Sequence, residues 1–378
     1  ARRQRQMCIR DRNKNVQTLS LGVMQMNKLK QVHEILEHKR LDALIVLSDF
    51  NRRYLSGFTG TSGALIITPD KNYLVTDFRY IEQATNQATE FEIINRQSGL
   101  ISEIKQILES KKLTNVGFEG HFISYDTYVE LNKGIITLIS IRDSIDKIRE
   151  VKNKEEIQLI KKAAEIVDKT YEYILSIAKV GMSEREIKAR LESKMLELGA
   201  DGPSFDTIVA SGYRGALPHG VASDKRIEKG DMITLDFGAY YRGYCSDITR
   251  TFAIGEPDPK MKEIYEIVLQ SQIKAIEEIK PGMTVQQADA LSRDYIESHG
   301  YGKEFGHSLG HGIGLDIHEG PLLSKNSEGE LKVNNCVTIE PGIYVDGLGG
   351  VRIEDDILIT ENGCDVFTKC TKDLIILE

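Results

Sequence analysis

Long apolar runs are missing from this sequence of 378 residues: none approaches the ~18 consecutive apolar residues that a membrane-spanning helix needs. Proline is scarce, with 8 residues, and the 40% hydrophobic and 28% charged residues are typical of a globular protein rather than a disordered or fibrous one. The 5 cysteines are odd in number and show no C-x-x-C spacing, so they support neither a disulfide framework nor a zinc ribbon. We therefore expect a cytoplasmic protein that does not enter a membrane.

Basic residues are fewer than acidic ones, so the net charge is −8 and the isoelectric point is near 5.7. Nucleic-acid binding requires a concentrated basic surface, so we expect no nucleic-acid partner and favour a small uncharged or cationic one. Residues 1–25 are the exception, with six basic residues against Asp11 and no hydrophobic periodicity. We expect them to be a disordered extension or a misplaced start before Met26, with an Arg-rich transit peptide as the alternative.

The remaining chain predicts an α/β (α+β) protein of two domains, residues 26–145 and 146–378. In the first, short apolar runs over 41–47 and 63–68 predict buried strands, and the pattern over 101–111 predicts a helix. A charged stretch then leads into the second domain.

The second domain contains an internal repeat. A long amphipathic helix, over 154–177 and again over 261–279, is followed by Gly-Met-Ser or Gly-Met-Thr and a second helix. Ser183 with Glu186, and Thr284 with Gln287, have the spacing of capping boxes. The repeat predicts a duplicated half-domain with pseudo-two-fold symmetry and a central cleft, where ligand sites commonly lie.

Residues 231–254 have the pattern of a β-hairpin. A tight turn centred between Tyr241 and Arg242 places Asp236 directly opposite Asp247, where like charges destabilise the pair unless a cation lies between them. Two solvated surface aspartates and a shifted register are the alternatives. Neighbouring apolar residues favour a buried hairpin, in which unpaired carboxylates are costly.

Three histidines, His307, His311 and His318, fall within twelve residues that also hold several glycines. A single histidine is more often a structural side chain than a ligand, but three of the chain's eight in one short segment suggest a site. The glycines disfavour a helix and allow the backbone to approach a bound group closely.

Further carboxylates follow. Glu340 ends a strand-like run over 336–339, and the alternation over 351–360 predicts a strand with Arg352, Glu354 and Asp356 on one face. Taken alone, Glu340 has the alternative of a turn-forming Glu-Pro-Gly. Taken alone, the segment 351–360 has the alternative of an exposed edge strand. Four carboxylates with one imidazole suit Mn²⁺, Co²⁺, Fe²⁺ or Zn²⁺ and exceed what one ion needs, so they predict two ions about 3.5–4 Å apart.

These motifs resemble the pita-bread metallopeptidases, and most closely Xaa-Pro aminopeptidase and Xaa-Pro dipeptidase (prolidase) with their creatinase-like N-terminal domain. The resemblance covers nearly everything from Met26 onward and implies an antiparallel sheet with flanking helices. The segments that carry it are residues 235–238, 246–251, 307–319, 339–342 and 351–355.

The resemblance implies a role for each matching residue. His219 and His318 match histidines that line the substrate site and act in catalysis, and His307 matches one close to it. We also name Arg352 as a candidate for binding the substrate's carboxylate. The implied metal ligands are Asp236, Asp247, His311, Glu340 and Glu354, with Asp247 and Glu354 bridging and Glu340 also acting in proton transfer.

The implied reaction is attack of a metal-bridging hydroxide on the peptide bond before proline, in a dipeptide or a longer peptide. We expect Mn²⁺ or Co²⁺, with Zn²⁺ or Fe²⁺ as alternatives, a small peptide substrate and a homodimer. A creatinase-like hydrolase, a methionine aminopeptidase and a metal-free binding protein remain the competing interpretations.

Overall fold

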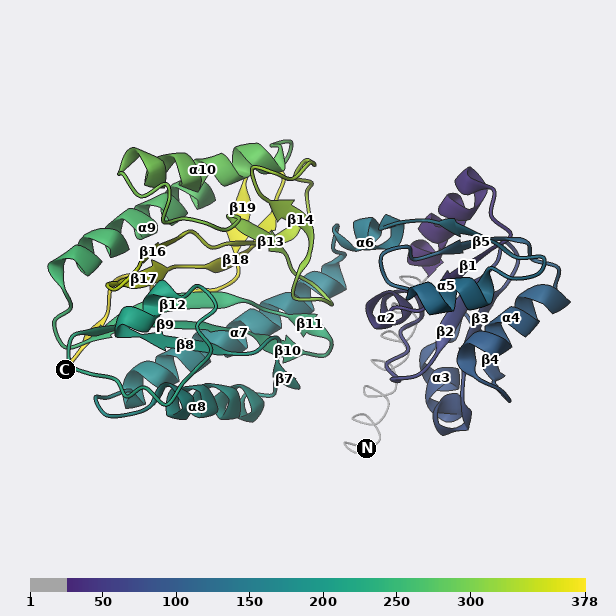
Figure 1. The fold of residues 1–378 in the computed structure, drawn as a ribbon, viewed down its shortest axis with the longest axis horizontal. Coiled ribbons are helices and arrows are strands. Elements are labelled where there is room, and N and C mark those ends of the chain that lie inside the picture. Colours follow the sequence, from purple (N-terminus) through teal and green to yellow (C-terminus); the bar gives the residue numbers. More distant parts are fainter. Residues whose placement is uncertain (1–25) are drawn as a thin grey trace, which may run out of the picture. The chain divides into compact units, whose positions relative to one another are not determined.

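A computed structural model describes residues 26–378 and divides the chain into two compact units, the first ending at Ile148 and the second spanning Arg149–Glu378 (Figure 1). The extension expected over residues 1–25 lies outside the described part. Among the described helices, none combines the length and apolar character needed to cross a bilayer.

The first unit contains a six-stranded mixed sheet with the order β4-β3-β2-β1-β5-β6. Its central strands are buried apolar runs such as Ala-Leu-Ile-Val, the pattern of a sheet covered on both faces. The strands are β1 Ala43–Val46, β2 Ala64–Ile67, β3 Asn72–Thr76, β4 Glu92–Asn95, β5 Asn115–Phe118 and β6 Thr137–Ser140. Besides residues 26–39, the helices are α2 Asp49–Ser56, η1 Phe78–Tyr80, α3 Ile81–Gln87, α4 Leu100–Ser110, α5 Tyr125–Leu131 and α6 Ser144–Arg149.

The second unit places its strands between two helix pairs, as Figure 1 shows. The helices are α7 Lys154–Ile177, α8 Glu184–Glu197, η2 Gly212–Ala216, α9 Pro259–Glu278 and α10 Val285–Ser298. The strands are β7 Gly202–Pro203, β8 Ile208–Ser211, β9 Asp231–Phe237, β10 Ala239–Tyr241, β11 Tyr244–Cys245, β12 Ile248–Ile254, β13 Gly310–Gly312, β14 Glu319–Leu323, β15 Cys336–Ile339, β16 Gly342–Val345, β17 Gly349–Arg352, β18 Asp355–Ile359, β19 Cys364–Val366 and β20 Ile376–Leu377.

Two separate apolar cores follow the predicted repeat. Ile187 of α8 belongs to one core with Phe252 of β12, and Val268 of α9 belongs to the other with Val337 of β15. One half carries the sheet β20-β12-β9-β8 and the other the sheet β14-β13-β15-β18-β19. Both predicted capping boxes are present, at the starts of α8 and α10.

The single strand predicted over 351–360 is instead two strands, β17 and β18. β17 pairs with β16, whereas β18 pairs with β15, so the chain changes partners between them. At the break, the Glu354 N–H donates to the Thr249 carbonyl (3.0 Å), which joins the two halves of the unit. The partner change places Glu354 beside the β9–β12 hairpin.

Candidate metal centre

The register of the β9–β12 hairpin differs from the predicted one. Asp236 lies opposite Thr249 rather than Asp247, because the turn is centred between Arg242 and Gly243. Both turn residues have positive φ (48° and 93°), which the tight two-residue hairpin turn requires. Asp247 is therefore a diagonal neighbour of Asp236 on the same face, a relation that normally separates side chains by about 7–8 Å. The two carboxylates are therefore farther apart than in the predicted directly opposite pairing.

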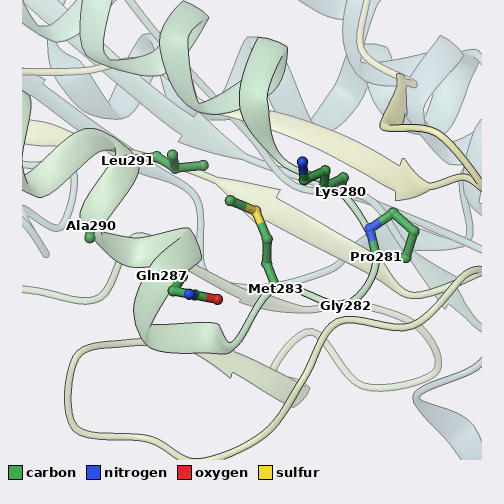
Figure 2. A pocket seen from close by; sticks show the side chains of 7 residues that line it. All are labelled: Lys280, Pro281, Gly282, Met283, Gln287, Ala290 and Leu291. Atoms are coloured by element: carbon green, nitrogen blue, oxygen red, sulfur yellow. The ribbon is translucent and has the colours of Figure 1, made fainter.

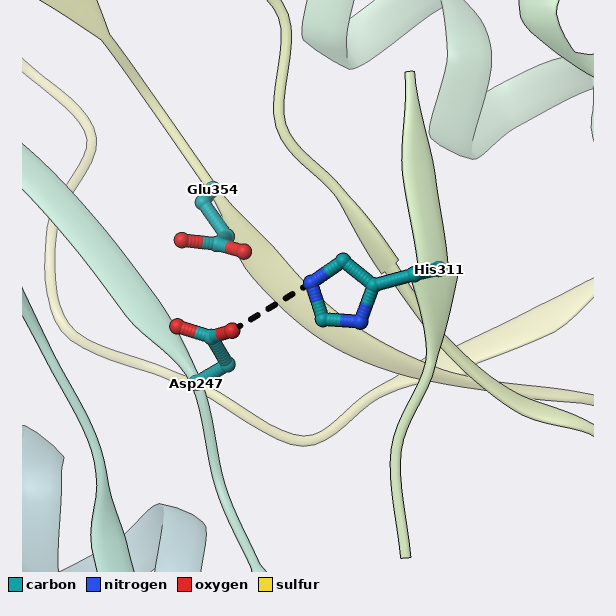
Figure 3. Close-up of side chains that lie close together, drawn as sticks. All are labelled: Asp247, His311 and Glu354. Atoms are coloured by element: carbon teal, nitrogen blue, oxygen red, sulfur yellow. Dashed lines mark ion pairs between the residues drawn. The ribbon is translucent and has the colours of Figure 1, made fainter. Parts of the chain in front are cut away.

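Asp247, His311 and Glu354 form a buried cluster whose ligand atoms lie within 4.8 Å of one another (Figure 3). The His311 Nδ1 donates to the Gly312 carbonyl (3.0 Å), which leaves Nε2 free to face the carboxylates. That Nε2 lies 3.5 Å from Asp247 Oδ2 and 3.3 Å from Glu340 Oε1. Four side chains from four separate segments of the chain thus lie close together.

Glu354 and Asp236 each have one carboxylate oxygen that accepts a hydrogen bond and one that accepts none from the described residues. Glu354 Oε2 accepts from Thr249 Oγ1 (2.6 Å), and Asp236 Oδ2 accepts from Arg352 (2.6 Å). Asp236 Oδ1, Asp247 Oδ1 and Glu354 Oε1 are buried, and none accepts a hydrogen bond within residues 26–378. Buried oxygens without donors are costly unless a cation binds them, so this donor set fits divalent metal ions.

The electrostatics of the cluster indicate missing positive charge. Burial, together with nearby Asp236, raises the pKa of Asp247 to about 7, and burial with Asp247 and Glu340 raises the pKa of Glu354 well above its ordinary value. Burial also acts to raise the pKa of Glu340, but the hydrogen bond and charge of His311 outweigh it and lower that pKa to about 2. Without metal, the pKa values of Asp247 and Glu354 are therefore raised toward the protonated form, whereas Glu340 stays ionised at neutral pH.

We expect the metal-free protein to lose stability as pH rises. A carboxyl with a raised folded-state pKa stabilises the fold while protonated, and this contribution is lost as pH passes through the folded pKa, which for Asp247 is about 7 against an ordinary 3.8. One such proton changes the unfolding free energy by about 1.4 kcal/mol per pH unit. Thermal unfolding in chelator from pH 5 to 8 measures this, and Asp247→Asn should flatten the profile. An equally steep profile in that variant contradicts the assignment.

The three other candidate histidines lie in different surroundings. The His318 ring packs edge-on against His311, with ring centres 4.5 Å apart. The His307 Nε2 lies 2.8 Å from the Tyr344 hydroxyl. His219 is exposed in the loop after η2, and the described residues provide it with no hydrogen bond, ion pair or ring contact. The structure thus places His318 in direct contact with His311 of the cluster. His307 is linked toward the site only through Tyr344, and His219 makes no direct contact with it.

Tyr344 was missed by the sequence reasoning, and Arg352 has partners that it did not foresee. The Arg352 guanidinium is buried and donates to the Tyr344 hydroxyl (2.8 Å), Thr249 Oγ1 (3.1 Å) and Asp236. Tyr344 lies on β16 and Arg352 on the paired strand β17, so only the pairing shows that they meet. A chain of hydrogen bonds therefore runs from His307 to Asp236.

A surface pocket of about 530 Å³ lies away from these residues. It surrounds the α9–α10 connection, and no predicted site residue lines it (Figure 2). Its lining residues are Lys280, Pro281, Gly282, Met283, Gln287, Ala290 and Leu291. The cluster of carboxylates and His311 is thus separate from this pocket.

Comparison with known families decides the class of the protein. Residues 158–361 match metallopeptidase family M24, and residues 28–151 match the creatinase/prolidase N-terminal domain. The chain belongs to metallopeptidase family M24. All five implied ligands of this M24 peptidase fall within the first matched range. The predicted resemblance, the pita-bread fold and the metallopeptidase class are confirmed.

Individual relatives cover nearly the whole chain. An Xaa-Pro dipeptidase of Pyrococcus horikoshii is 41% identical over 355 residues, spanning 92% of this chain and 98% of that protein. The structure of an Xaa-Pro dipeptidase from Bacillus anthracis is 47% identical with a TM-score of 0.91, covering 93% of this chain and 100% of the other. That of an X-Pro aminopeptidase from Thermotoga maritima is 40% identical with a TM-score of 0.83, covering 89% and 98%.

Proposed function

We propose that this M24 peptidase hydrolyses the peptide bond before proline with the help of two divalent metal ions. The observation that carries the metal proposal is the set of buried carboxylate oxygens without donors around His311 Nε2. The names of the relatives, Xaa-Pro dipeptidase and X-Pro aminopeptidase, support proline as the residue after the cleaved bond. The proposed ligands are Asp236, Asp247, His311, Glu340 and Glu354.

The number of donors favours two ions over one. Four carboxylates and an imidazole exceed what a single ion binds, and Asp247 and Glu354, which lie together in the cluster with His311, are the ligands that two ions would share in this proposal. When bound, two such ions lower the pKa of a water molecule and polarise the scissile carbonyl. Mn²⁺ or Co²⁺ are the proposed ions, with Zn²⁺ or Fe²⁺ as alternatives, because ligand type alone does not select among them.

The protein's own side chains supply the remaining steps. Glu340 lies against His311 with its pKa lowered, so it is ionised at neutral pH and is the proposed group that accepts a proton from the attacking water. Burial, and then the adjacent His311, lower the pKa of His318, so its neutral imidazole keeps one N–H to donate to the developing oxyanion. His219 is the proposed second donor, near the departing proline nitrogen.

We also propose a domain organisation, a cellular location and an oligomeric state for the protein. Residues 26–145 are assigned to a creatinase-like domain and 146–378 to the catalytic domain. A cytoplasmic homodimer that acts on small peptides is proposed, with His307 and Arg352 near the substrate. Because Arg352 already binds Asp236 and Tyr344, its contact with a substrate carboxylate has to use its remaining N–H groups.

A substrate panel with metal add-back tests the proposal. After chelation we expect no hydrolysis of Xaa-Pro or Xaa-Pro-Yaa peptides, and recovery with Mn²⁺ or Co²⁺. The ratio of the two rates then assigns dipeptidase or aminopeptidase activity. Met-Xaa peptides and creatine serve as controls for the competing activities. Turnover of either control substrate above the Xaa-Pro peptides, or no metal uptake, refutes the proposal.

A further inference from the structure

A second buried acid, Glu184, lies outside the metal cluster and has an unusually complete set of donors. It is the first residue of α8 and its side chain is fully buried. Oε1 accepts from the backbone N–H (2.8 Å) and hydroxyl (2.9 Å) of Ser211. Oε2 accepts from the N–H (2.9 Å) and hydroxyl (2.7 Å) of Ser223 and also pairs with Arg214. Five donors thus converge on one carboxylate.

These donors bracket the segment that carries His219. Ser211 and Ser223 lie at its two ends, and Arg214 donates onward to the Val221 carbonyl (3.0 Å) inside it. The segment contributes little to the apolar core, because Tyr213 and Leu217 are 62% and 53% exposed. Because the segment buries few apolar side chains, the hydrogen bonds to the buried Glu184 carboxylate, rather than apolar packing, fix the backbone position of its ends.

The same segment is also attached to β8 and β17, two strands that lie next to proposed metal ligands. Val221 forms a bridge with Ile208, and Ile208 pairs in register with Asp236. On the other side, the backbone at Gly215 approaches Gly350 of β17 so closely that a Cβ there would lie 3.0 Å from the Gly350 nitrogen. The segment is therefore held against both β8 and β17, and the Glu184 carboxylate adds an attachment at its two ends, Ser211 and Ser223.

The second half of the domain contains a similar anchor beneath another of the site histidines. Asp289 of α10 is buried, pairs with Arg293 and accepts from the Leu309 N–H (3.0 Å). Arg293 donates to the carbonyl of His307 (2.6 Å). An acid and an arginine thus hold a histidine-bearing segment in each half.

We propose that Glu184, with Arg214, is a positioning residue that sets the place of His219 relative to the metal ligands. Its effect on catalysis rests on the proposed function, in which His219 contacts the substrate. Glutamine at this position keeps the side-chain shape but turns an N–H₂ donor toward groups that are themselves donors. Residues 212–222 should then lose their fixed position while the metal ligands, on other elements, keep theirs.

The test compares Glu184→Gln with Glu186→Gln as the matched control. Glu186 is exposed on the same first turn, and the capping box at α10 already uses glutamine in its place. We expect Glu184→Gln to lower kcat on an Xaa-Pro peptide by about 10- to 100-fold, the scale of a small misplacement of a catalytic group. Metal content should stay at the wild-type value, and hydrogen exchange of residues 212–222 should accelerate. Glu186→Gln should change none of these.

A double-mutant cycle separates positioning from general destabilisation. In a His219→Ala background, Glu184→Gln should have little further effect on kcat, because both substitutions remove the same contribution. Additive losses, or unchanged exchange in 212–222, overturn the proposal. If Glu184→Gln does not fold, the partly exposed Arg214→Gln is used in both measurements with the same expectations. If the wild-type protein cleaves no Xaa-Pro peptide, the proposed function fails, and hydrogen exchange alone decides whether Glu184 holds the segment.

Discussion

Replacing Glu354 with glutamine is expected to lower kcat/KM by about 10³-fold, the upper range for loss of one electrostatic group at a reacting centre. The same variant should be more stable than wild type in chelator above pH 7. Burial and the repulsion of Asp247 and Glu340 raise the pKa of Glu354, so its ionisation destabilises the metal-free fold, and an amide removes that cost. Thr249 Oγ1 can still donate to the amide oxygen, since it donates to Glu354 Oε2 now.

The neighbouring residue provides a matched control. Asp355 is equally buried, but it pairs with Arg250 (2.7 Å) and Lys372 (2.9 Å). Asp355→Asn should therefore destabilise the protein by roughly 3–5 kcal/mol, the usual cost of breaking a buried ion pair. Its folded fraction should still bind metal. Steady-state kinetics and thermal unfolding with and without chelator measure both variants, and equal stability shifts in the two would refute the charge assignment.

Glu340→Ala is expected to abolish hydrolysis while the fold remains intact. The substitution removes a proposed ligand and the proposed proton acceptor together, so kcat should fall by more than about 10³-fold. The backbone hydrogen bond from Glu340 to the Leu309 carbonyl (2.8 Å) is kept by alanine, which is why the fold should persist.

The stability change should have the opposite sign to that of Glu354→Gln. Although burial acts to raise the pKa of Glu340, His311 lowers it to about 2, so the ionised Glu340 stabilises the metal-free fold at neutral pH. Glu340→Ala should therefore lower the unfolding temperature in chelator. Unfolding at pH 7 and circular dichroism check this. Retained turnover removes Glu340 from the mechanism, whereas raised stability contradicts the pairing with His311.

Local patterns predicted the elements of the fold well. The helix expected over 154–177 coincides with α7, and the strand over 336–339 coincides with β15. Helical periodicity and the capping-box spacing are properties of neighbouring residues, so sequence is sufficient to show them. The strand predicted over 351–360 was divided because its break depends on Thr249, which is distant in the sequence.

In the candidate site, too, contacts between residues distant in the sequence could not be predicted. Asp236 and Asp247 were correctly expected on one hairpin, but a one-residue shift of the turn made them diagonal rather than opposite. The anchor at Glu184 and the contact between Tyr344 and His307 depend on side chains brought together by strand pairing. No spacing rule in a single sequence contains that information. The assignment of individual ligands stays a prediction until metal binding is measured.

The proposed metal ligands are divided between the two halves of the domain, which bears on how the protein folds. Asp236 and Asp247 come from one helix–sheet layer, while His311, Glu340 and Glu354 come from the other, more than sixty residues later in the chain. Contacts between such distant residues form slowly, because the intervening chain must close first. We therefore expect newly made chains to expose these acidic side chains to water before the proposed ligands come together, so that metal ions would bind late in folding.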